Sequence, residues 1–344
     1  MYLRKVIKVL LVSFKVILLM NRVIPIAKLK YTSYLLASSI ALEVAGYPKP
    51  GNVHRLRDFS DTMFEDFLIT ATIVEHHVFR ALLRGCKLTR GFSLKILIGD
   101  LIESSVKESK RVSGGGNTCL GSALLLYPLA VACGYIACIN KGVLEASSIA
   151  RSARDLVYKY STVLDSVHFY NAVRAASPSY IRKSDVVGDL PNIWDEDYRE
   201  KLIAGSYRLW DILEYSSRSD IVCREIVDGY TRSLRNTLFL KERLKTHSNW
   251  NLALVETYLY QLARDIDTLI TKKHGLNVAM WVSERAKEVL DLCLTSREKC
   301  LNTTWVFDHE LAKRGINPGS SADIIVSTIA LYAVQKRNSI IRTP

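Results

Sequence analysis

Apolar residues recur at helical spacing along almost the whole chain. The segment 61–84 is typical, with apolar residues at Phe64, Leu68, Ala71, Val74, Val78 and Leu82. This spacing places the side chains on one face of an α-helix. The alternating apolar and polar pattern of a half-buried strand is nearly absent. The sequence therefore predicts an all-α fold.

Glycine, proline and capping residues indicate where the helices begin and end. In segment 61–84 we expect Ser60 or a carboxylate to cap the start, and Gly85 to lie just past the end. The segment 177–191 is expected to be a longer loop with some extended backbone. The predicted helices cover 33–45, 61–84, 94–110, 118–137, 142–159, 161–175, 196–217, 220–245, 250–264, 278–296 and 320–337.

The segment Thr118–Ala137 is apolar on nearly all sides. Such a helix is buried, and we expect it at the centre of the fold with a kink at Pro128. No repeat or long linker divides the 344 residues. We therefore expect a single all-α catalytic domain over 31–340 with glycine-rich loops between its helices. Residues 1–30 would form an N-terminal extension or an extra helix.

The first 23 residues are apolar and basic. Lys8 and Lys15 interrupt them, so no uncharged run approaches the roughly 18 residues that span a bilayer. No small-residue cleavage site follows, which argues against a signal peptide. An extra helix, or an extension upstream of a start at Met20, is favoured over an amphipathic membrane-surface helix. Stable membrane insertion is not expected.

The net charge of +13 favours anionic partners, namely nucleic acid, anionic lipid or a polyphosphate ligand. Charge alone does not choose among them. The seven cysteines include no C-x-x-C pair, and the chain is too long to need disulfides for stability. We expect reduced cysteines in a cytoplasmic protein, with no zinc site and no redox pair.

Three corners between helices combine glycines, a small polar residue and a following apolar helix. They are PKPGN (Pro48–Asn52), SGGGNTCLGSALLL (Ser113–Leu126) and GINPGSSADIIVSTIAL (Gly315–Leu331). Backbone N–H groups at a glycine-shaped helix N-terminus suit a phosphate. The second corner is not a Walker A loop, because Ser122 stands where the lysine belongs. A stiff turn or close helix packing would also explain each corner alone.

Carboxylates and cations accompany these corners. Asp267 ends an apolar helix and is followed by Lys272, Lys273 and His274, while Asp323 falls in the first turn of the last helix. A solvated helix end and a favourable helix dipole are the simpler explanations for these two segments. Glu43, Glu75, Asp267 and Asp323 nevertheless all lie near helix ends or in apolar helices, where unpaired carboxylates are costly. Together the residues describe a pocket for Mg²⁺ and a polyphosphate.

Four motifs resemble those of the triphosphoribosyl-dephospho-CoA synthase family, in the same order. EVAGYPKPGNVHR resembles the family's E-V-x-x-x-P-K-P-G, and SGGGNTCLG resembles T-G-G-x-N-T-x-x-G. DIDTLITKKHG resembles an Asp-Thr segment with a basic-glycine turn, and INPGSSADIIVSTIAL resembles S/N-P-G-G-S-A-D-L-L. The resemblance covers about Ser33 to Gln335 and implies an all-α fold.

The chain also departs from the bacterial pattern of that family. NVHRLRDFSDTMF follows PKPG in place of L-V-D-R and a G-A-H-x-D-M segment, and Cys119-Leu120 replaces a His-Lys pair. Asp267-Thr268-Leu269 stands in place of D-T-N. The phosphate-handling frame is retained while substrate-side residues differ, which resembles an archaeal-type branch.

The resemblance implies a transferase that joins ATP to the ribose 2′-hydroxyl of 3′-dephospho-CoA and releases adenine. It implies catalytic roles for Glu43, His54 and Asp267, and Mg²⁺ bound through Glu43, Asp267 and Asp323. His54 is included because its side chain titrates near neutral pH, although it would equally serve to brace its loop. The implied nucleotide-binding residues are Lys49, Gly51, Asn52, Arg55, Gly115, Gly116, Asn117, Thr118, Lys272, Lys273, His274, Ser320 and Ser321.

Two alternatives remain open. One is an enzyme of the same fold with a different small-molecule acceptor, or one that carries out phosphoribosyl transfer or nucleotide hydrolysis. The other is a non-enzymatic basic helical protein that binds RNA or a membrane surface, which would need a broad exposed basic stripe with aromatic residues. The enzyme instead requires Pro48–Arg55, Gly114–Thr118, Asp267–His274 and Asn317–Asp323 to line one cleft. We therefore expect ATP and a dephospho-CoA-like molecule as partners and no specific nucleic acid.

Overall fold

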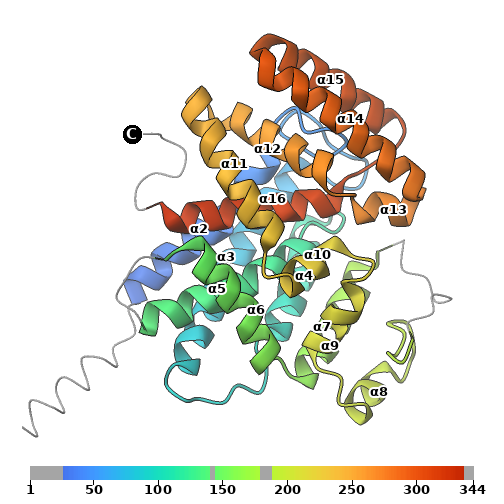
Figure 1. Ribbon diagram of the computed structural model, residues 1–344. Helices are drawn as coiled ribbons and strands as arrows, with labels where there is room; N and C mark the ends of the chain where they lie inside the picture. The colour runs from blue at the N-terminus through green and yellow to red at the C-terminus, as the bar shows by residue number, and fades with distance from the viewer. Residues whose placement is uncertain (1–25, 140–143, 179–187, 337–344) are drawn as a thin grey trace, which may run out of the picture.

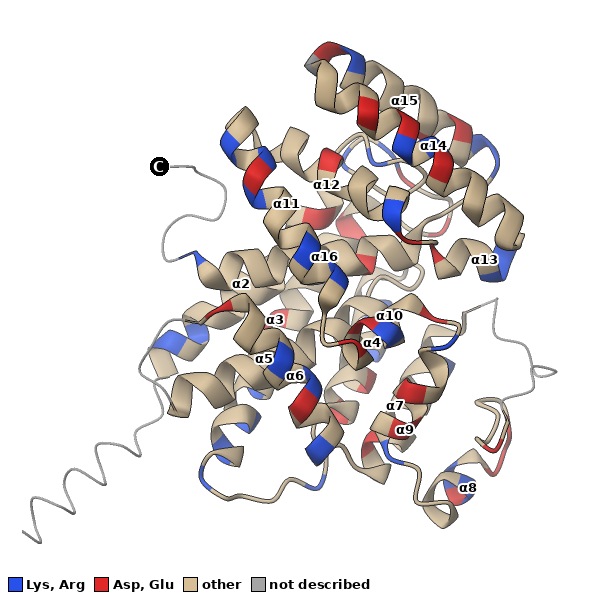
Figure 2. Cartoon of the chain, viewed as in Figure 1, with Lys and Arg blue, Asp and Glu red and all other residues tan. Residues whose placement is uncertain are grey.

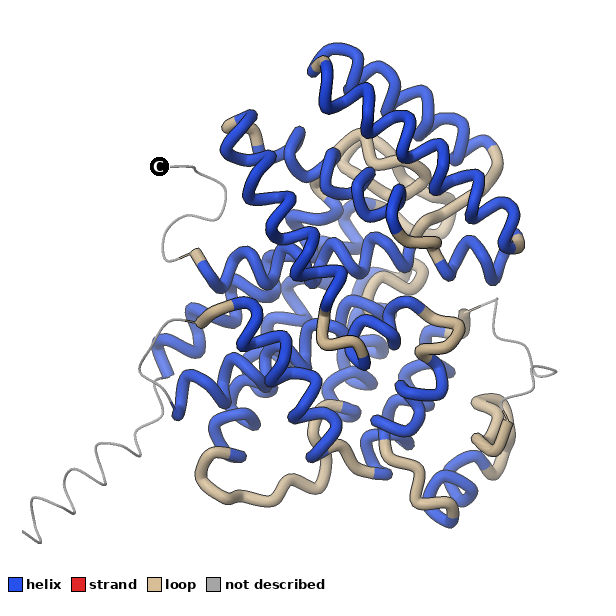
Figure 3. Tube along the Cα trace, in the orientation of Figure 1, coloured by secondary structure: helices blue, strands red, loops and turns tan. Residues whose placement is uncertain are grey.

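The computed structural model describes residues 26–139, 144–178 and 188–336, and every regular element in these ranges is a helix (Figure 3). The predicted all-α fold is therefore confirmed. The N-terminal residues 1–25 and part of the predicted loop, 179–187, lie outside the described residues.

The helices follow the predicted segments closely in most of the chain. The segment 196–217 contains two helices, and so does 220–245, because Ser206 and Tyr230 adopt positive φ between them. Two helices, α13 and α15, were not predicted. The helices are α2 (Ile26–Val44), α3 (Phe64–Leu88), α4 (Gly99–Ser113), α5 (Leu120–Ile139), α6 (Ala146–Tyr160), α7 (Val163–Ala176), α8 (Tyr198–Ala204), α9 (Leu209–Ser216), α10 (Ile221–Val227), α11 (Thr231–His247), α12 (Trp250–Arg264), α13 (Thr268–His274), α14 (Leu276–Thr295), α15 (Arg297–Lys313) and α16 (Gly319–Gln335).

Helix α5 is the predicted central helix, and other helices bury most of its length. It packs against α3, α6 and α16, and Pro128 lies inside it. Among the described helices it is the one long and apolar enough to cross a bilayer, and 72% of its most apolar window is buried inside the protein. A core helix passes the same test of length and composition.

Helix α3 does not end at Gly85 as predicted, but continues to Leu88, and its N-cap is Met63 rather than Ser60 or Asp61. Gly85 instead allows α3 to contact α5. A Cβ atom at Gly85 would lie 2.0 Å from the carbonyl oxygen of Val131, and one at Gly134 would lie 1.9 Å from that of Leu82. The two glycines therefore set how closely these helices pack.

The buried apolar residues form two clusters that share α16. One cluster lies among α2 to α10, and Ile324 and Leu331 of α16 belong to it. The other lies among α11, α12, α14 and α15, and includes Ile325 and Ile329 of α16. In Figure 1, α16 crosses the middle of the molecule. Helices α14 and α15 lie at the top of the view, and α8 lies at the bottom. The loops that follow α2 and precede α16 lie where the two groups of helices meet.

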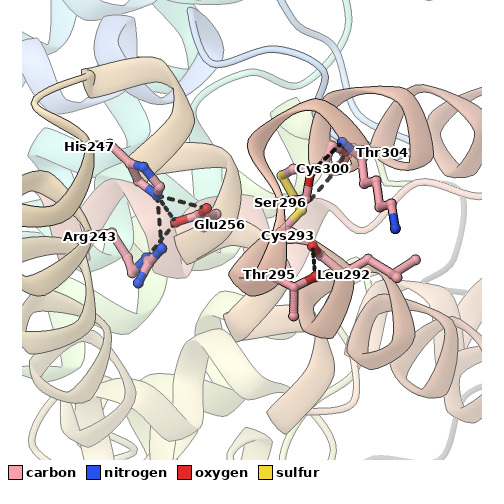
Figure 4. Close-up of a disulfide and its surroundings, with 10 residues drawn as sticks. Arg243, His247, Glu256, Leu292, Cys293, Thr295, Ser296, Cys300 and Thr304 are labelled. Atoms are coloured by element: carbon pink, nitrogen blue, oxygen red, sulfur yellow. Dashed lines mark hydrogen bonds and ion pairs between the residues drawn. A yellow bond between two sulfur atoms is a disulfide. The ribbon is translucent and has the colours of Figure 1, made fainter.

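The cysteine prediction is wrong for four of the residues. Cys86 pairs with Cys138, joining α3 to α5, and Cys293 pairs with Cys300, joining α14 to α15. Figure 4 shows the second pair beside Ser296, whose hydroxyl caps α15 by accepting from the Lys299 N–H. Helix packing brings Cys86 and Cys138 together across 52 positions, so no local spacing signals this pair. The free cysteines are buried; they are Cys119, Cys133 and Cys223.

We predict that Gly85→Ala destabilises the fold by about 1–3 kcal/mol, because the added methyl group overpacks the contact with α5. Denaturant unfolding followed by circular dichroism measures the effect. Thr72→Ala, at an exposed position of the same helix, is the control and should change stability by less than about 0.5 kcal/mol. Equal stability of the Gly85 variant and the native protein would contradict the packing described here.

Candidate active site

A cavity of about 1010 Å³ opens between the two groups of helices. Each of the four predicted segments contributes to its wall, through Asn52, residues 116–118, Lys272 and Lys273, and residues 317–323 in part. The predicted meeting of these segments at one cleft is therefore confirmed, although Asn52 is the one residue of Pro48–Arg55 that lines it. The opposite wall is more apolar and comes from α7, α9 and the segment before α8; it includes Phe169, Tyr170, Val173, Ile193, Ile212 and Tyr215.

The N-terminus of α5 faces this cavity. The Asn117 side chain caps the helix by accepting from the N–H groups of Cys119 (3.3 Å) and Leu120 (3.1 Å). The preceding turn is held from outside, because the Gly116 N–H donates to the carbonyl oxygen of Asp61 at 2.7 Å. A long helix that begins at a ligand cavity favours negative charge there.

Glu43 lines the cavity and is paired with a lysine behind it. The Lys49 ammonium donates to Glu43 Oε1 at 2.5 Å, and both side chains are almost completely buried. Burial raises the pKa of Glu43 and lowers that of Lys49, while their mutual attraction acts in the opposite direction. The Lys49 ammonium therefore neutralises a cavity carboxylate in this structure and does not itself line the cavity.

Asp323 is the second buried carboxylate in the cavity wall. Its Oδ1 accepts from the Ser122 hydroxyl at 2.7 Å. Gly121 makes room for it, since a Cβ atom there would lie 2.0 Å from Asp323 Oδ2. Burial, together with the neighbouring negative charge of Glu43, raises the pKa of Asp323 to about 7. This carboxyl group can therefore gain or lose a proton near neutral pH.

Asp267 is buried and accepts three backbone hydrogen bonds. Its Oδ1 caps α13 through the N–H groups of Leu269 (2.9 Å) and Ile270 (3.0 Å), and its Oδ2 accepts from the Ser321 N–H at 2.7 Å. Both oxygens thereby join the start of α13 to the start of α16. Asp267 does not line the cavity, and backbone N–H groups already occupy three of the roughly four acceptor positions of its carboxylate.

The loop after α2 is fastened by a carboxylate that sequence reasoning missed. Asp308, on the unpredicted helix α15, accepts from the Gly51 N–H at 3.1 Å and from Arg57 Nε at 2.8 Å. His54 is fully buried and its Nε2 lies 3.3 Å from Asp308 Oδ2. The burial of His54 fits a role in bracing its own loop. A catalytic role for His54 stays a prediction.

The other predicted residues divide into two sets. Asn52 lines the cavity and its side chain donates to the Pro318 carbonyl oxygen at 3.4 Å, which ties two of the corners together. Arg55 stacks on the Tyr47 ring outside the cavity wall, at 5.2 Å. The predicted residues that line the cavity are Glu43, Asn52, Gly116, Asn117, Thr118, Lys272, Lys273, Ser320 and Asp323, and those that do not are Lys49, Gly51, His54, Arg55, Gly115, Asp267, His274 and Ser321.

Several charged residues of the wall were not predicted. Asp220 caps α10 and forms an ion pair with Lys272 of α13, so that the pair joins the two groups of helices. The others are Arg57, Asp58, Asp61 and Lys110. The segment RLRDFSD carries most of this charge, but nothing in its sequence distinguishes the residues that face the cavity.

Within the ranges that the structure describes, no three His, Cys, Asp or Glu side chains converge to form a metal site by themselves. Glu43 and Asp323 nevertheless line the same cavity, and the negative charge of Glu43 opposes ionisation of Asp323. Mg²⁺ is commonly held by one or two carboxylates together with substrate phosphates and water. The two carboxylates fit that mode of binding, in which the substrate completes the site.

The fold and the cavity define a class of all-α proteins whose pocket is polar where two helices begin and apolar on the opposite wall. Such a pocket suits an anionic small molecule. The chain belongs to the ATP:dephospho-CoA triphosphoribosyl transferase family, which it matches over residues 30–341.

Individual relatives are more distant. The 2-(5''-triphosphoribosyl)-3'-dephosphocoenzyme-A synthase of Escherichia fergusonii is 29% identical over 105 residues, which is 30% of this chain and 35% of that protein. The Salmonella typhi protein named "Probable 2-(5''-triphosphoribosyl)-3'-dephosphocoenzyme-A synthase 1" is 29% identical over 85 residues, 25% of this chain and 28% of that one. The matched region thus spans about a third of these curated relatives.

A crystal structure of a triphosphoribosyl-dephospho-coA synthase-type protein from Archaeoglobus fulgidus has a similar fold. The TM-score is 0.54 with 24% identity, and the similarity covers 76% of this chain and 97% of the other. At this identity the similarity supports the fold alone.

We predict that ionisation of Asp323 destabilises the protein as pH rises. Its pKa is about 7 in the fold and near its ordinary value of 3.8 when unfolded. The stability that the neutral carboxyl contributes is therefore complete below about pH 4 and is lost as pH rises through about 7. Asp323→Asn should consequently gain about 1–4 kcal/mol relative to the native protein between pH 5 and pH 8. Urea unfolding at both pH values, without ligand, measures this gain, and a difference independent of pH would contradict it.

We also predict that Lys49→Met destabilises the protein by about 3–5 kcal/mol, because it leaves the Glu43 carboxylate buried without its counter-ion. The matched control is Lys30→Met, which removes the partner of the half-buried Glu75. That variant should lose less than about 1 kcal/mol, as for other solvent-exposed pairs. Similar losses in the two variants, measured by urea unfolding, would show that the Glu43–Lys49 pair does not behave as a buried one.

Proposed function

We propose that the protein is an ATP-dependent triphosphoribosyl transferase that acts on dephospho-CoA or a closely similar acceptor. The family match supports this reaction class. The observation that carries the proposal is the meeting of all four motif segments at one cavity of about 1010 Å³. Such a volume lies at the upper end for small-molecule sites, which suits a reaction between two nucleotide-sized substrates.

In the proposed reaction the 2′-hydroxyl oxygen of the acceptor ribose bonds to C1′ of the ATP ribose. The C1′–N9 bond breaks, adenine leaves, and the triphosphate stays on the transferred ribose. The hydroxyl proton passes to a base while a proton is delivered to the departing adenine. Glu43 and Asp323 support these roles because both carboxyl groups line the cavity and burial raises the pKa of each. General acid–base help of this kind is worth about 10²–10⁴-fold.

We propose that the triphosphate lies toward the N-termini of α5 and α16 and that Mg²⁺ binds with it. The metal would neutralise phosphate charge, and either Glu43 or Asp323 would hold it while the other takes part in proton transfer. Asn117 and Ser320 line the cavity at the two helix starts, where backbone N–H groups favour anions. Asp267 contributes by joining the start of α13 to the start of α16. This connection holds Lys272 and Lys273 of α13 in place relative to α16.

The apolar wall formed by α7 and α9 suits the uncharged portion of the acceptor. An acceptor of the same class with a different tail remains the alternative, since this wall carries none of the family motifs. The RNA-binding or membrane-surface alternative is less favoured, because the Lys and Arg positions visible in Figure 2 are spread over many helices rather than along one face.

We propose the cytoplasm as the compartment, because that is where ATP is supplied. Disulfides are rare there. The disulfides Cys86–Cys138 and Cys293–Cys300 count against this compartment. Counting free thiols in protein extracted under acid quench would test this assignment.

We predict that the protein incubated with Mg²⁺, ATP and dephospho-CoA releases adenine and adds a triphosphoribosyl group to dephospho-CoA. Liquid chromatography with mass spectrometry detects both products, and ATP without acceptor is the control. Gly121→Ala should abolish the product, because the added Cβ atom would lie 2.0 Å from Asp323 Oδ2 and displace that carboxylate. If ATP binds but neither product forms with dephospho-CoA, the acceptor assignment is wrong.

A further inference from the structure

The loop that carries the PKPGN motif is held on α15 through one buried carboxylate. Asp308 is fully buried, and its Oδ1 accepts from the Gly51 N–H at 3.1 Å. Its Oδ2 accepts from Arg57 Nε at 2.8 Å, and Arg57 Nη2 lies at the same distance. The start and the end of the loop are thus fastened to the same side chain.

His54 completes this cluster. Its Nδ1 accepts from the Leu56 N–H at 3.2 Å, and its Nε2 lies 3.3 Å from Asp308 Oδ2. His54 and Arg57 also exchange backbone hydrogen bonds, at 3.0 and 2.8 Å, which close the turn between them. Arg57 is therefore the permanently charged partner of Asp308 within the cluster.

Arg57 is fixed along one edge of its guanidinium group and open along the other. Asp308 occupies the Nε and Nη2 side, and no described residue accepts a hydrogen bond from Nη1. The side chain is 20% exposed and lines the cavity. A guanidinium held along one edge is pre-organised to bind an anion with its remaining N–H groups.

The charge balance of the cavity makes a fixed cation important. Asp58 and Asp61 line the same wall as Arg57, and Lys272 is paired with Asp220. A phosphate entering this cavity therefore meets carboxylates as well as cations. We therefore expect its binding to depend on a cation whose unoccupied N–H groups point in a fixed direction, more than on the total number of positive charges.

We propose that Arg57 binds a phosphate group of the nucleotide substrate and that Asp308 is the positioning residue that holds it. The proposal rests on the proposed function only in taking a polyphosphate as the ligand. It replaces Arg55 by Arg57 as the anion-binding arginine of this loop. It also gives α15 a part in substrate binding through a residue that touches no substrate.

The test is calorimetric titration with Mg²⁺ and inorganic tripolyphosphate, and separately with adenosine. Arg57→Gln should weaken tripolyphosphate binding at least tenfold and leave adenosine binding within about twofold. Asp308→Asn, which keeps the shape of the side chain and loses its charge, should weaken tripolyphosphate binding about threefold to tenfold. The double variant should bind no more weakly than Arg57→Gln, because Asp308 acts through Arg57.

The matched control is Glu310→Gln, a carboxylate of the same helix that pairs with Arg285 and Arg314 on the outer side of α15. It should bind both ligands as the native protein does. Native-like tripolyphosphate affinity in Arg57→Gln would overturn the proposal. Additive losses in the double variant would overturn the positioning role of Asp308, as would equal losses for tripolyphosphate and adenosine in Asp308→Asn.

Arg57→Gln keeps the proposal testable if the Asp308 variant fails to fold, because Arg57 is partly exposed. Arg57→Lys should recover part of the lost affinity, since it restores the charge but not the fixed edge. None of these titrations requires transfer of a triphosphoribosyl group. A failed transfer assay with an intact binding pattern would therefore reject the proposed reaction and leave this inference in place.

Discussion

The loops around the cavity depend on buried carboxylates that accept hydrogen bonds from backbone N–H groups. Asp308 holds the loop after α2, and Asp267 joins the starts of α13 and α16. Asp165 of α7 does the same farther away, accepting from three consecutive N–H groups at the start of α4, those of Leu97, Ile98 and Gly99. Burying a carboxylate is costly unless such donors satisfy it. Each of these residues therefore fixes loops from different parts of the chain relative to one another.

Two other buried carboxylates lack a comparable set of backbone donors. Glu43 is paired with Lys49, and Asp323 has one hydroxyl partner, Ser122. Both line the cavity, and burial raises the pKa of both. Asp267 and Asp308, by contrast, do not line the cavity and hold loops through backbone hydrogen bonds. This difference supports our proposal that Glu43 and Asp323 are the reactive pair.

Local signals were sufficient to predict the helical fold and the central helix α5, whereas the meeting of the four loops was predicted from the four motifs taken together. Apolar periodicity marks the helices, and glycines and prolines mark the corners. The sequence was not sufficient to distinguish Arg55 from Arg57, since their direction is set by Asp308, which lies 251 positions after Arg57. The sequence did not predict helix α15, because its apolar residues are only weakly segregated to one face. The pairing of Cys86 with Cys138 likewise follows from packing of α3 on α5 and not from spacing.

We propose that the cavity at the junction of the two helix groups binds the triphosphate of ATP. A crystal structure of the protein with Mg²⁺ and ATP would locate the nucleotide. We expect phosphate density between the N-termini of α5 and α16, with Arg57 in contact and with Glu43 or Asp323 beside the metal. Nucleotide bound on another surface, with this cavity unchanged, would show that the triphosphate site lies elsewhere.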